Sequence, residues 1–183
     1  LMEEPTFVRK RVFLLQADMT QFRLATRFGA VICPCNTFSA LTSDERRAVW
    51  PIVSDHLQSG GLLAASLPNP AVLAQFAKPS FNESILEDVI SHPQTGNPVQ
   101  VSNTVEGDED GVIWRWHYDH LLPTGHVNRS TISTKHYLTS AEIYQQEMEK
   151  AGLNLLGLYG DFEKGEYSKE SQYLIFVARK IVF

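Results

Sequence analysis

The feature that most constrains this chain is an apolar run, a helix-forming segment and a second apolar run in the first part of the sequence. The two runs are FGAVICPC at residues 28–35 and LLAASLPNP at residues 62–70, and the segment between them is TSDERRAVWPIVSDHLQSGG. Short continuous apolar runs are typical of strands that are buried on both faces of a parallel sheet. The order predicts one β-α-β unit with a right-handed crossover.

The segment between the two runs carries start and stop signals for a helix. Thr42 and Glu45 have the spacing of a capping box, and Gly60-Gly61 is expected to end the helix. Pro51 is expected to bend it, because proline removes a backbone donor. The apolar stripe that would face the core comprises Ala48, Val49, Ile52, Val53 and Leu57.

An earlier apolar run, RVFLLQAD, lies at residues 11–18, very close to the start of the sequence. Its composition is that of a buried strand, and it ends in the polar residue Asp18. We therefore predict a further strand of the same sheet over this run.

The period of the apolar residues changes after about residue 71. A helix is predicted over 71–90, broken near Pro79, and three alternating stretches follow at residues 99–106, 111–120 and 126–137. Alternation with turn residues between the stretches predicts a small antiparallel meander. One face of its middle strand would be aromatic and apolar: Val112, Trp114, Trp116 and Tyr118.

The last part of the chain predicts a helix and a hairpin. Thr139 and Glu142 form a second candidate capping box, and Gly152 is a candidate C-cap. Two apolar strands, 153–162 and 172–183, are joined by a short charged turn and should be antiparallel neighbours. We expect a single α/β domain over residues 1–183, with a core formed by 1–70 and 138–183 and with an inserted helix and β meander at about 71–137 covering the site.

Composition excludes several classes of function. The chain has 16 basic and 21 acidic residues, net charge −5, and no basic face, so we expect no nucleic-acid partner. No stretch approaches the roughly 18 apolar residues of a membrane span, and no secretory signal is recognisable. Cys33 and Cys35 are too close for an ordinary disulfide, which favours a cytoplasmic protein. The meander histidines match no metal-ligand spacing, so no metal site is expected.

The order of these segments resembles roughly the C-terminal two-thirds of the class I S-adenosylmethionine-dependent methyltransferases. The likeness is carried by LLQADM, FGAVICPCNTFSAL, LQSGGLLAASLPNP, LTSAEIYQQEMEKAGL, and LYGDF with SQYLIFVARK. It implies an α/β fold with a partial Rossmann-like methyltransferase sheet, a terminal antiparallel hairpin and an inserted antiparallel β meander. It also implies methyl transfer from S-adenosylmethionine to a small-molecule acceptor.

The resemblance also implies a donor site at the carboxyl ends of the strands. The Asp18 carboxylate would accept a hydrogen bond from the adenine amino group, and the Met19 amide would address a ring nitrogen. Pro34, Cys35 and Asn36 would lie beside the methionine part of the donor. The alternative is structural: Asp18 caps a turn, and Asn36 is an ordinary turn asparagine.

Methyl transfer mainly requires alignment of donor and acceptor, so spacing alone names no catalytic residue. The meander would cover the donor site and select the acceptor. The residues that we expect on the acceptor side, each with a structural role as the alternative, are Phe38, Trp116, His117, Tyr118, Tyr159 and Asp161.

The chain departs from the family at its start. The Gly-rich loop after the family's first strand and the acid after its second strand are missing, and Gly60-Gly61 comes too late in the order to be that loop. We expect a fragment or a truncated member.

Two other readings remain. The first is a non-catalytic or partner-completed binding module, forming a homodimer through unpaired strand edges. The second, a nucleotide-dependent oxidoreductase, lacks the Gly-rich dinucleotide fingerprint.

Overall fold

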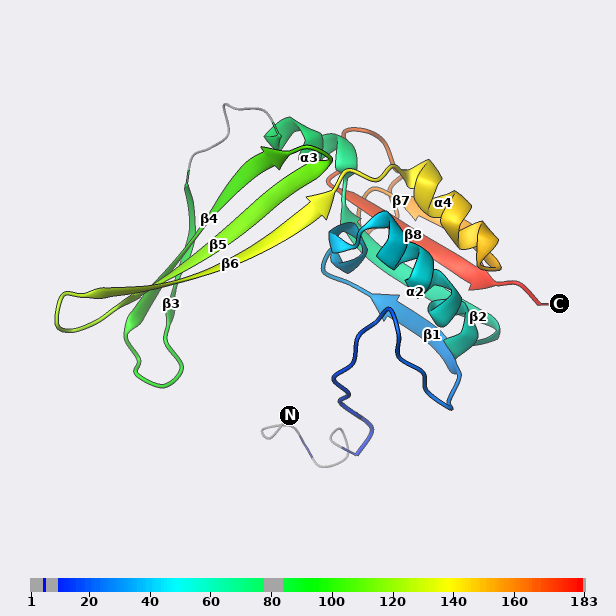
Figure 1. Cartoon of the computed structure of the whole chain (residues 1–183), viewed down its shortest axis with the longest axis horizontal. Helices are drawn as coiled ribbons and strands as arrows, with labels where there is room; N and C mark the ends of the chain where they lie inside the picture. Colours follow the sequence, from blue (N-terminus) through cyan, green and yellow to red (C-terminus); the bar gives the residue numbers. More distant parts are fainter. Residues whose placement is uncertain (1–4, 6–9, 78–83, 183) are drawn as a thin grey trace.

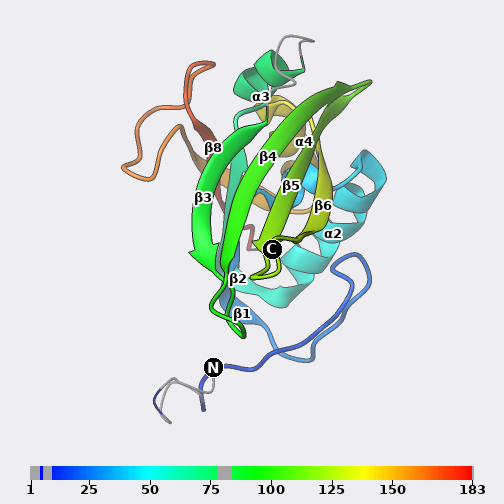
Figure 2. The ribbon, with the colours of Figure 1, turned by 90° about the vertical axis from the view of Figure 1, so that its left-hand side faces the viewer.

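The described residues of the computed structural model, 5, 10–77 and 84–182, form two four-stranded sheets. One sheet has the order β1-β2-β8-β7 and lies under α2 and α4, and the other has the order β3-β4-β5-β6 and extends away from it (Figure 1). Seen from the meander side, β3 to β6 follow one another across the sheet, and β6 lies on the side of α2 (Figure 2). The chain therefore has a core sheet and a separate meander sheet.

The core sheet confirms the predicted β-α-β unit and terminal hairpin. β1 (Phe28–Cys33) pairs in parallel with β2 (Leu57–Pro68), and α2 (Ser43–His56) makes the connection between them. β8 (Tyr173–Lys180) is antiparallel both to β2 and to β7 (Leu153–Tyr159). β1 and β2 consequently present their carboxyl ends at one edge of the sheet.

The start of α2 was predicted correctly, but its end was not. The Thr42 hydroxyl accepts a hydrogen bond from the Glu45 amide, and the Glu45 carboxylate accepts one from the Thr42 amide at 2.7 Å, which confirms the capping box. The predicted stop at Gly60-Gly61 is wrong, because the helix ends at His56 and β2 starts at once with Leu57, which is fully buried and pairs with Phe28. Gly60, at φ 74°, instead lies where the register between β1 and β2 shifts.

The strand predicted over residues 11–18 is wrong. The described residues there have no strand conformation, and Phe13 and Leu14 are 90% and 80% exposed. A run becomes a strand only when neighbouring strands supply hydrogen-bond partners and cover its side chains. Among the described residues, β1 pairs only with β2, so this run forms no ladder with the outer edge of β1.

The meander sheet confirms the three predicted alternating strands and adds a fourth. β4 (Pro98–Asp108), β5 (Gly111–Leu121) and β6 (Val127–Tyr137) are successive antiparallel strands, and β3 (Ile85–Ser91) pairs with β4. The helix predicted over 71–90 is confirmed in α3 (Pro70–Phe76) and is wrong over residues 85–90, because residues 85–91 gain a hydrogen-bonding edge from β4 that their local sequence does not show. The break expected at Pro79 lies outside the described residues.

α4 (Ala141–Lys150) lies where the sequence predicted it, with a different cap. Ser140, rather than Thr139, is the N-cap, and its hydroxyl accepts a hydrogen bond from the Ile143 amide, so the second capping box is wrong. The C-cap is Ala151 rather than Gly152, which follows it at φ 75°, a left-handed conformation typical of the residue after a C-cap. Tyr144 and Met148 of this helix point inward and are buried.

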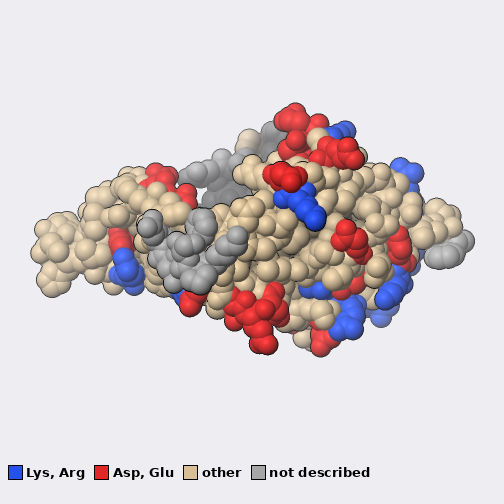
Figure 3. All heavy atoms as spheres, turned by 90° about the horizontal axis from the view of Figure 1, so that it is seen from above, with Lys and Arg blue, Asp and Glu red and all other residues tan. Residues whose placement is uncertain are grey.

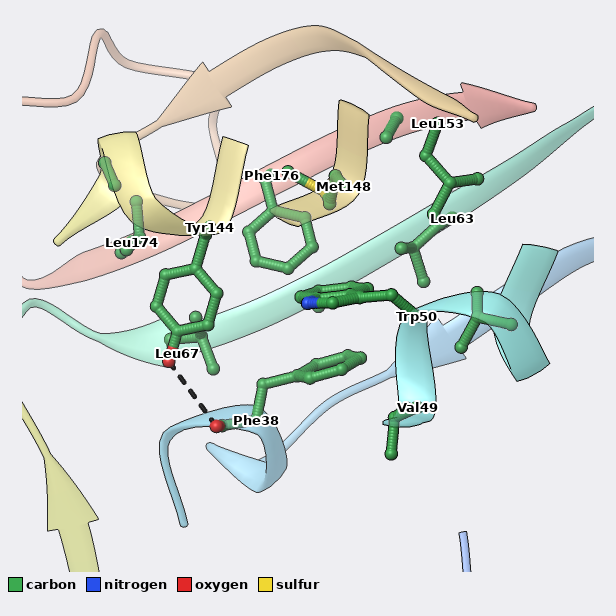
Figure 4. Close-up of a cluster of buried hydrophobic side chains, with 14 of the residues drawn as sticks. Phe38, Val49, Trp50, Leu63, Leu67, Tyr144, Met148, Leu153, Leu174 and Phe176 are labelled. Carbon is green, nitrogen blue, oxygen red and sulfur yellow. Dashed lines mark hydrogen bonds between the residues drawn. The ribbon is translucent and has the colours of Figure 1, made fainter. Parts of the chain in front are cut away.

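The core lies between α2, α4 and the sheet, and it contains a group of packed aromatic side chains among aliphatic ones (Figure 4). The Phe38 ring stacks on Trp50 at 4.4 Å between centroids, and Phe176 and Tyr144 pack around the pair. Phe38 belongs to a short 3-10 helix, η1 (Thr37–Ala40), just after β1. Burial of each large apolar side chain contributes about 1.5–3 kcal/mol, so this packing fixes η1, and with it the end of β1, against the core.

Candidate functional site

The turn that follows β1 is the most unusual piece of backbone at the carboxyl edge of the sheet. Cys35 and Asn36 both have left-handed conformations, with φ 58° and 63°. Such conformations cost free energy for residues other than glycine and are concentrated at functional sites. The Asn36 amide donates to the Ser66 carbonyl of β2 at 3.2 Å, which ties the turn to the neighbouring strand. In open α/β sheets this is the edge where ligands bind.

η1 holds this turn from the other side. The Ser39 hydroxyl and the Ser39 amide both donate to the Asn36 carbonyl, at 2.7 and 3.1 Å. The Phe38 ring, which we predicted on the acceptor side, lies in the core, fully buried against Trp50. The Pro34–Asn36 turn is thus held by β2 and η1 together.

A polar side chain that the sequence analysis missed secures the end of β2. Asn69 is fully buried, and its Oδ1 accepts hydrogen bonds from the Ala71 amide at 3.0 Å and the Tyr167 hydroxyl at 3.1 Å. Its Nδ2 lies within 2.6–3.3 Å of three carbonyls in the loop before β8, those of Ser168, Lys169 and Ser171. The sequence signal that could have revealed Asn69 is the proline that follows it, because an asparagine N-cap with proline at the first helical position is typical of a helix start.

Asp18 opens a turn at the same edge. Its carboxylate accepts hydrogen bonds from the Thr20 amide at 2.8 Å, the Thr20 hydroxyl at 2.7 Å and the Gln21 side chain at 2.7 Å. The Thr20 hydroxyl, followed by the Thr20 amide and Gln21, lowers the pKa of Asp18. Hydrogen bonds from Thr42 lower the pKa of Glu45, at the N-terminus of α2, and the negative charge of Asp18 opposes this lowering. The half-buried Met19 packs against the core cluster.

His56 anchors the far end of this N-terminal segment, a role with no signal in the local sequence. Its Nε2 accepts a hydrogen bond from the Leu24 amide at 2.7 Å, and its Nδ1 lies 2.7 Å from the Ile52 carbonyl. Nδ1 must donate to that carbonyl, so the imidazole is neutral with its hydrogen on Nδ1. The Phe22 ring stacks on it at 4.8 Å. The segment that carries Asp18 is therefore pinned to α2.

The three β5 residues predicted on the acceptor side do not share one face. Trp116 and Tyr118 lie on the face of Trp114, whereas His117 points to the opposite face and lies 2.9 Å from the Thr131 hydroxyl. The Trp114 and Trp116 rings are parallel, with centroids 6.0 Å apart. The Trp114 Nε1 is the single buried side-chain nitrogen or oxygen without a hydrogen-bond partner in the part of the chain that the structure describes.

One hydrogen bond between side chains joins the base of the meander to the site. The Ser39 hydroxyl of η1 lies 2.8 Å from Nδ1 of His136, which is on β6 and buried. Burial lowers the pKa of His136 and favours the neutral ring. This junction fixes the position of β6 beside the turn after β1, and the sequence analysis missed it because the two residues are 97 positions apart.

Tyr159 and Asp161 lie at the end of β7, which is separated from β1 by β2 and β8. The Asp161 carboxylate accepts hydrogen bonds from the Glu163 amide at 2.9 Å and the Gly165 amide at 2.8 Å, so it shapes the turn toward β8. The Asp18 carboxylate thus lies within electrostatic reach of Glu45, in the helix that follows the Pro34–Asn36 turn and η1, whereas Tyr159 and Asp161 lie at the opposite side of the sheet.

Two further observations concern metal binding and membrane insertion, and a third concerns surface charge. Within the described ranges, no group of three or more His, Cys, Asp or Glu side chains could hold a metal ion, and no helix is long and apolar enough to cross a membrane. On the face shown in Figure 3, acidic and basic side chains are interspersed.

Comparison with known proteins identifies the fold. The sequence matches no protein-family model and no curated protein. A solved S-adenosylmethionine-dependent methyltransferase from Clostridium acetobutylicum is similar, with a TM-score of 0.78 and 14% identity over 96% of this chain and 68% of that one. The sugar N-methyltransferase KedS8 from Streptoalloteichus is similar with a TM-score of 0.69 and 22% identity, over 91% of this chain and 62% of that one.

A third similar structure is CalS10, an amino pentose methyltransferase from Micromonospora echinaspora solved with S-adenosylmethionine bound. Its TM-score is 0.63 and its identity 18%, over 90% of this chain and 63% of that one. This chain therefore spans between 62% and 68% of the length of these three proteins. It has the fold of the S-adenosylmethionine-dependent methyltransferases, which confirms the predicted fold class.

Proposed function

We propose that this chain binds S-adenosylmethionine and transfers its methyl group to a small-molecule acceptor. The observation that carries the proposal is the strained turn after β1 at the carboxyl edge of the sheet, together with the Asp18–Met19 turn, whose charge acts on Glu45 at the N-terminus of α2. The resemblance to the methyltransferases implies that the methyl donor binds at this carboxyl edge of the sheet.

On the donor side, the Asp18 carboxylate and the Met19 amide would bind the adenine. Both Asp18 oxygens already accept hydrogen bonds from residues 20 and 21, which aim the carboxylate, and a carboxylate oxygen can accept more than one. Pro34, Cys35 and Asn36 would lie along the methionine part of the donor. The Asn36 side chain makes no hydrogen bond to the described residues and is available for that role.

On the acceptor side, the inserted segment at about 71–137 would cover the donor site, with Trp116 and Tyr118 on the meander face of His136, which is bonded to Ser39. The solved neighbours whose descriptions name a sugar or an amino pentose support a polar small molecule as acceptor. His117, Phe38, Tyr159 and Asp161 stay predictions for this side. The protein mainly aligns the acceptor with the methyl carbon, and alignment lowers such barriers by up to about 7–11 kcal/mol.

Titration with S-adenosylhomocysteine tests the donor site. Calorimetry should give micromolar binding to the wild-type chain and to Asp161→Ala, and no binding to Asp18→Ala. Asp161 is the matched control because it also shapes a turn with its carboxylate, at the other side of the sheet. Asp18→Asn separates charge from turn geometry, since its amide oxygen still accepts from Thr20. A cooperatively folded wild-type chain that does not bind would contradict the proposal.

The assembly prediction is a separate proposal. β1 has an unpaired outer edge among the described residues, and beside it lies an apolar groove of about 800 Å³ lined by residues that include Phe13, Leu14 and Leu24. Such edges favour pairing with a second copy, and we propose a homodimer. Sedimentation at increasing concentration tests it, and a monomer throughout would exclude it.

The free thiols of Cys33 and Cys35 support the proposed cytoplasmic location.

A further inference from the structure

The junction between η1 and β6 fixes which nitrogen of His136 carries hydrogen. The Ser39 hydroxyl has a single hydrogen, and it donates that hydrogen to the Asn36 carbonyl at 2.7 Å, because a carbonyl can only accept. The Ser39 oxygen can therefore only accept from His136 Nδ1, which lies 2.8 Å away. The neutral imidazole consequently has its hydrogen on Nδ1 and its lone pair on Nε2.

The surroundings of His136 favour this neutral form. Its neighbours are the Ser39 hydroxyl and the Trp114 ring, which lies edge-on with centroids 6.2 Å apart. The charged side chain next to it, Lys135, belongs to the other face of β6 and pairs with Asp108 and Asp110. Nε2 bonds to nothing within residues 5, 10–77 and 84–182, although it is not sealed from solvent as Trp114 Nε1 is.

The position of His136 connects the two halves of the proposed site. Two successive hydrogen bonds, through Ser39, lead from its ring to the Asn36 carbonyl in the turn assigned to the methyl donor. On the meander, His136 shares its face with Trp114 and Trp116, where the acceptor would lie. An unprotonated nitrogen thus stands where donor and acceptor would meet.

We propose that His136 Nε2 is the base that receives the acceptor's proton, an inference that rests on the proposed function. An oxygen or nitrogen lone pair of the acceptor forms the bond to the methyl carbon. The carbon–sulfur bond breaks, and its electron pair stays on sulfur to give the neutral thioether. The O–H or N–H proton passes to Nε2, and the resulting imidazolium releases it to water. The acceptor class that this step names is a polar molecule with a hydroxyl or amine group.

The hydrogen position is tested by nitrogen-15 NMR of the histidine-labelled wild-type chain. We expect the Nδ1–H tautomer at neutral pH, and a titration midpoint below the roughly 6.5 of an unperturbed histidine. This measurement needs neither donor nor acceptor. A hydrogen on Nε2 would overturn the assignment even if the chain proves to be a methyltransferase.

The catalytic role is tested with His136→Asn, whose amide keeps a donor near Ser39 but removes Nε2, and with His126→Asn, an exposed turn histidine, as control. Glucosamine, which offers both hydroxyls and an amine, is the acceptor probe, with methyl-labelled S-adenosylmethionine. We expect His136→Asn to bind S-adenosylhomocysteine as the wild type does and to transfer methyl about 10²–10⁴-fold more slowly, without the acidic limb of the pH profile.

Equal rates for His136→Asn and His126→Asn would overturn the inference while leaving the proposed function intact. Loss of S-adenosylhomocysteine binding by the wild-type chain would instead count against the proposed function itself. The two failures are therefore distinguishable.

Discussion

An ion pair between α2 and α4 offers the sharpest test of the packing argument. Arg46 Nε and Nη2 donate to the two carboxylate oxygens of Glu147 at 3.1 and 3.2 Å, and the two side chains are only 4% and 12% exposed. Arg46 Nη1 also donates to the Leu41 carbonyl at 3.0 Å, and the Trp50 indole donates to Glu147 at 2.9 Å. Glu147 therefore satisfies two buried donors of α2 at once.

Substitution of Glu147 by alanine should destabilise the chain severely. The change leaves the Arg46 guanidinium buried without its counter-ion, which typically costs about 3–5 kcal/mol. It also leaves the Trp50 N–H unpaired, a loss of about 1–3 kcal/mol that is not simply additive. We expect a total of about 3–5 kcal/mol, a large share of the roughly 5–15 kcal/mol that stabilises a domain.

Urea denaturation followed by circular dichroism measures this change. The double variant Arg46→Met with Glu147→Met should be more stable than Glu147→Ala, because apolar groups replace both charges. Asp44→Ala, which breaks the exposed Asp44–Arg47 pair, is the matched control and should change little. A loss below about 1 kcal/mol for Glu147→Ala, or a double variant no more stable than the single one, would refute the reasoning.

Two further predictions follow from hydrogen bonding. Trp114→Phe should cost less stability than Trp50→Phe in the same urea assay, because the Trp114 N–H is unpaired whereas the Trp50 N–H is bonded to Glu147; the opposite order would contradict this. The two hydrogen bonds from Arg129 lower the pKa of Asp119, so the carboxylate stabilises the fold above pH about 4, and this contribution is lost as pH falls through the lowered pKa. Asp119→Asn should therefore lower the melting temperature at pH 7, and the difference from wild type should shrink below pH about 4; a difference independent of pH would exclude this origin.

The sequence by itself determined those helices and strands that depend on interactions between residues close together in the chain. The Thr42–Glu45 capping box lies within four consecutive residues, and the start of α2 was predicted correctly from it. Strict alternation predicted β5, because one face of that strand packs against protein whichever partner it finds. The order of these elements was sufficient to indicate the methyltransferase fold.

Only the tertiary structure decided the features that depend on distant partners. Residues 11–18 and 85–91 both carry apolar residues, yet only the second run is a strand, because it pairs with β4, whereas the first run pairs with no described strand. Ser39 and His136 meet across 97 positions, so no local pattern announces the junction. The spacing of side chains along the sequence indicates which helices and strands can form. Strand edges and buried hydrogen-bond partners come from distant parts of the chain. They decide which of these elements form and which side chains meet at the site.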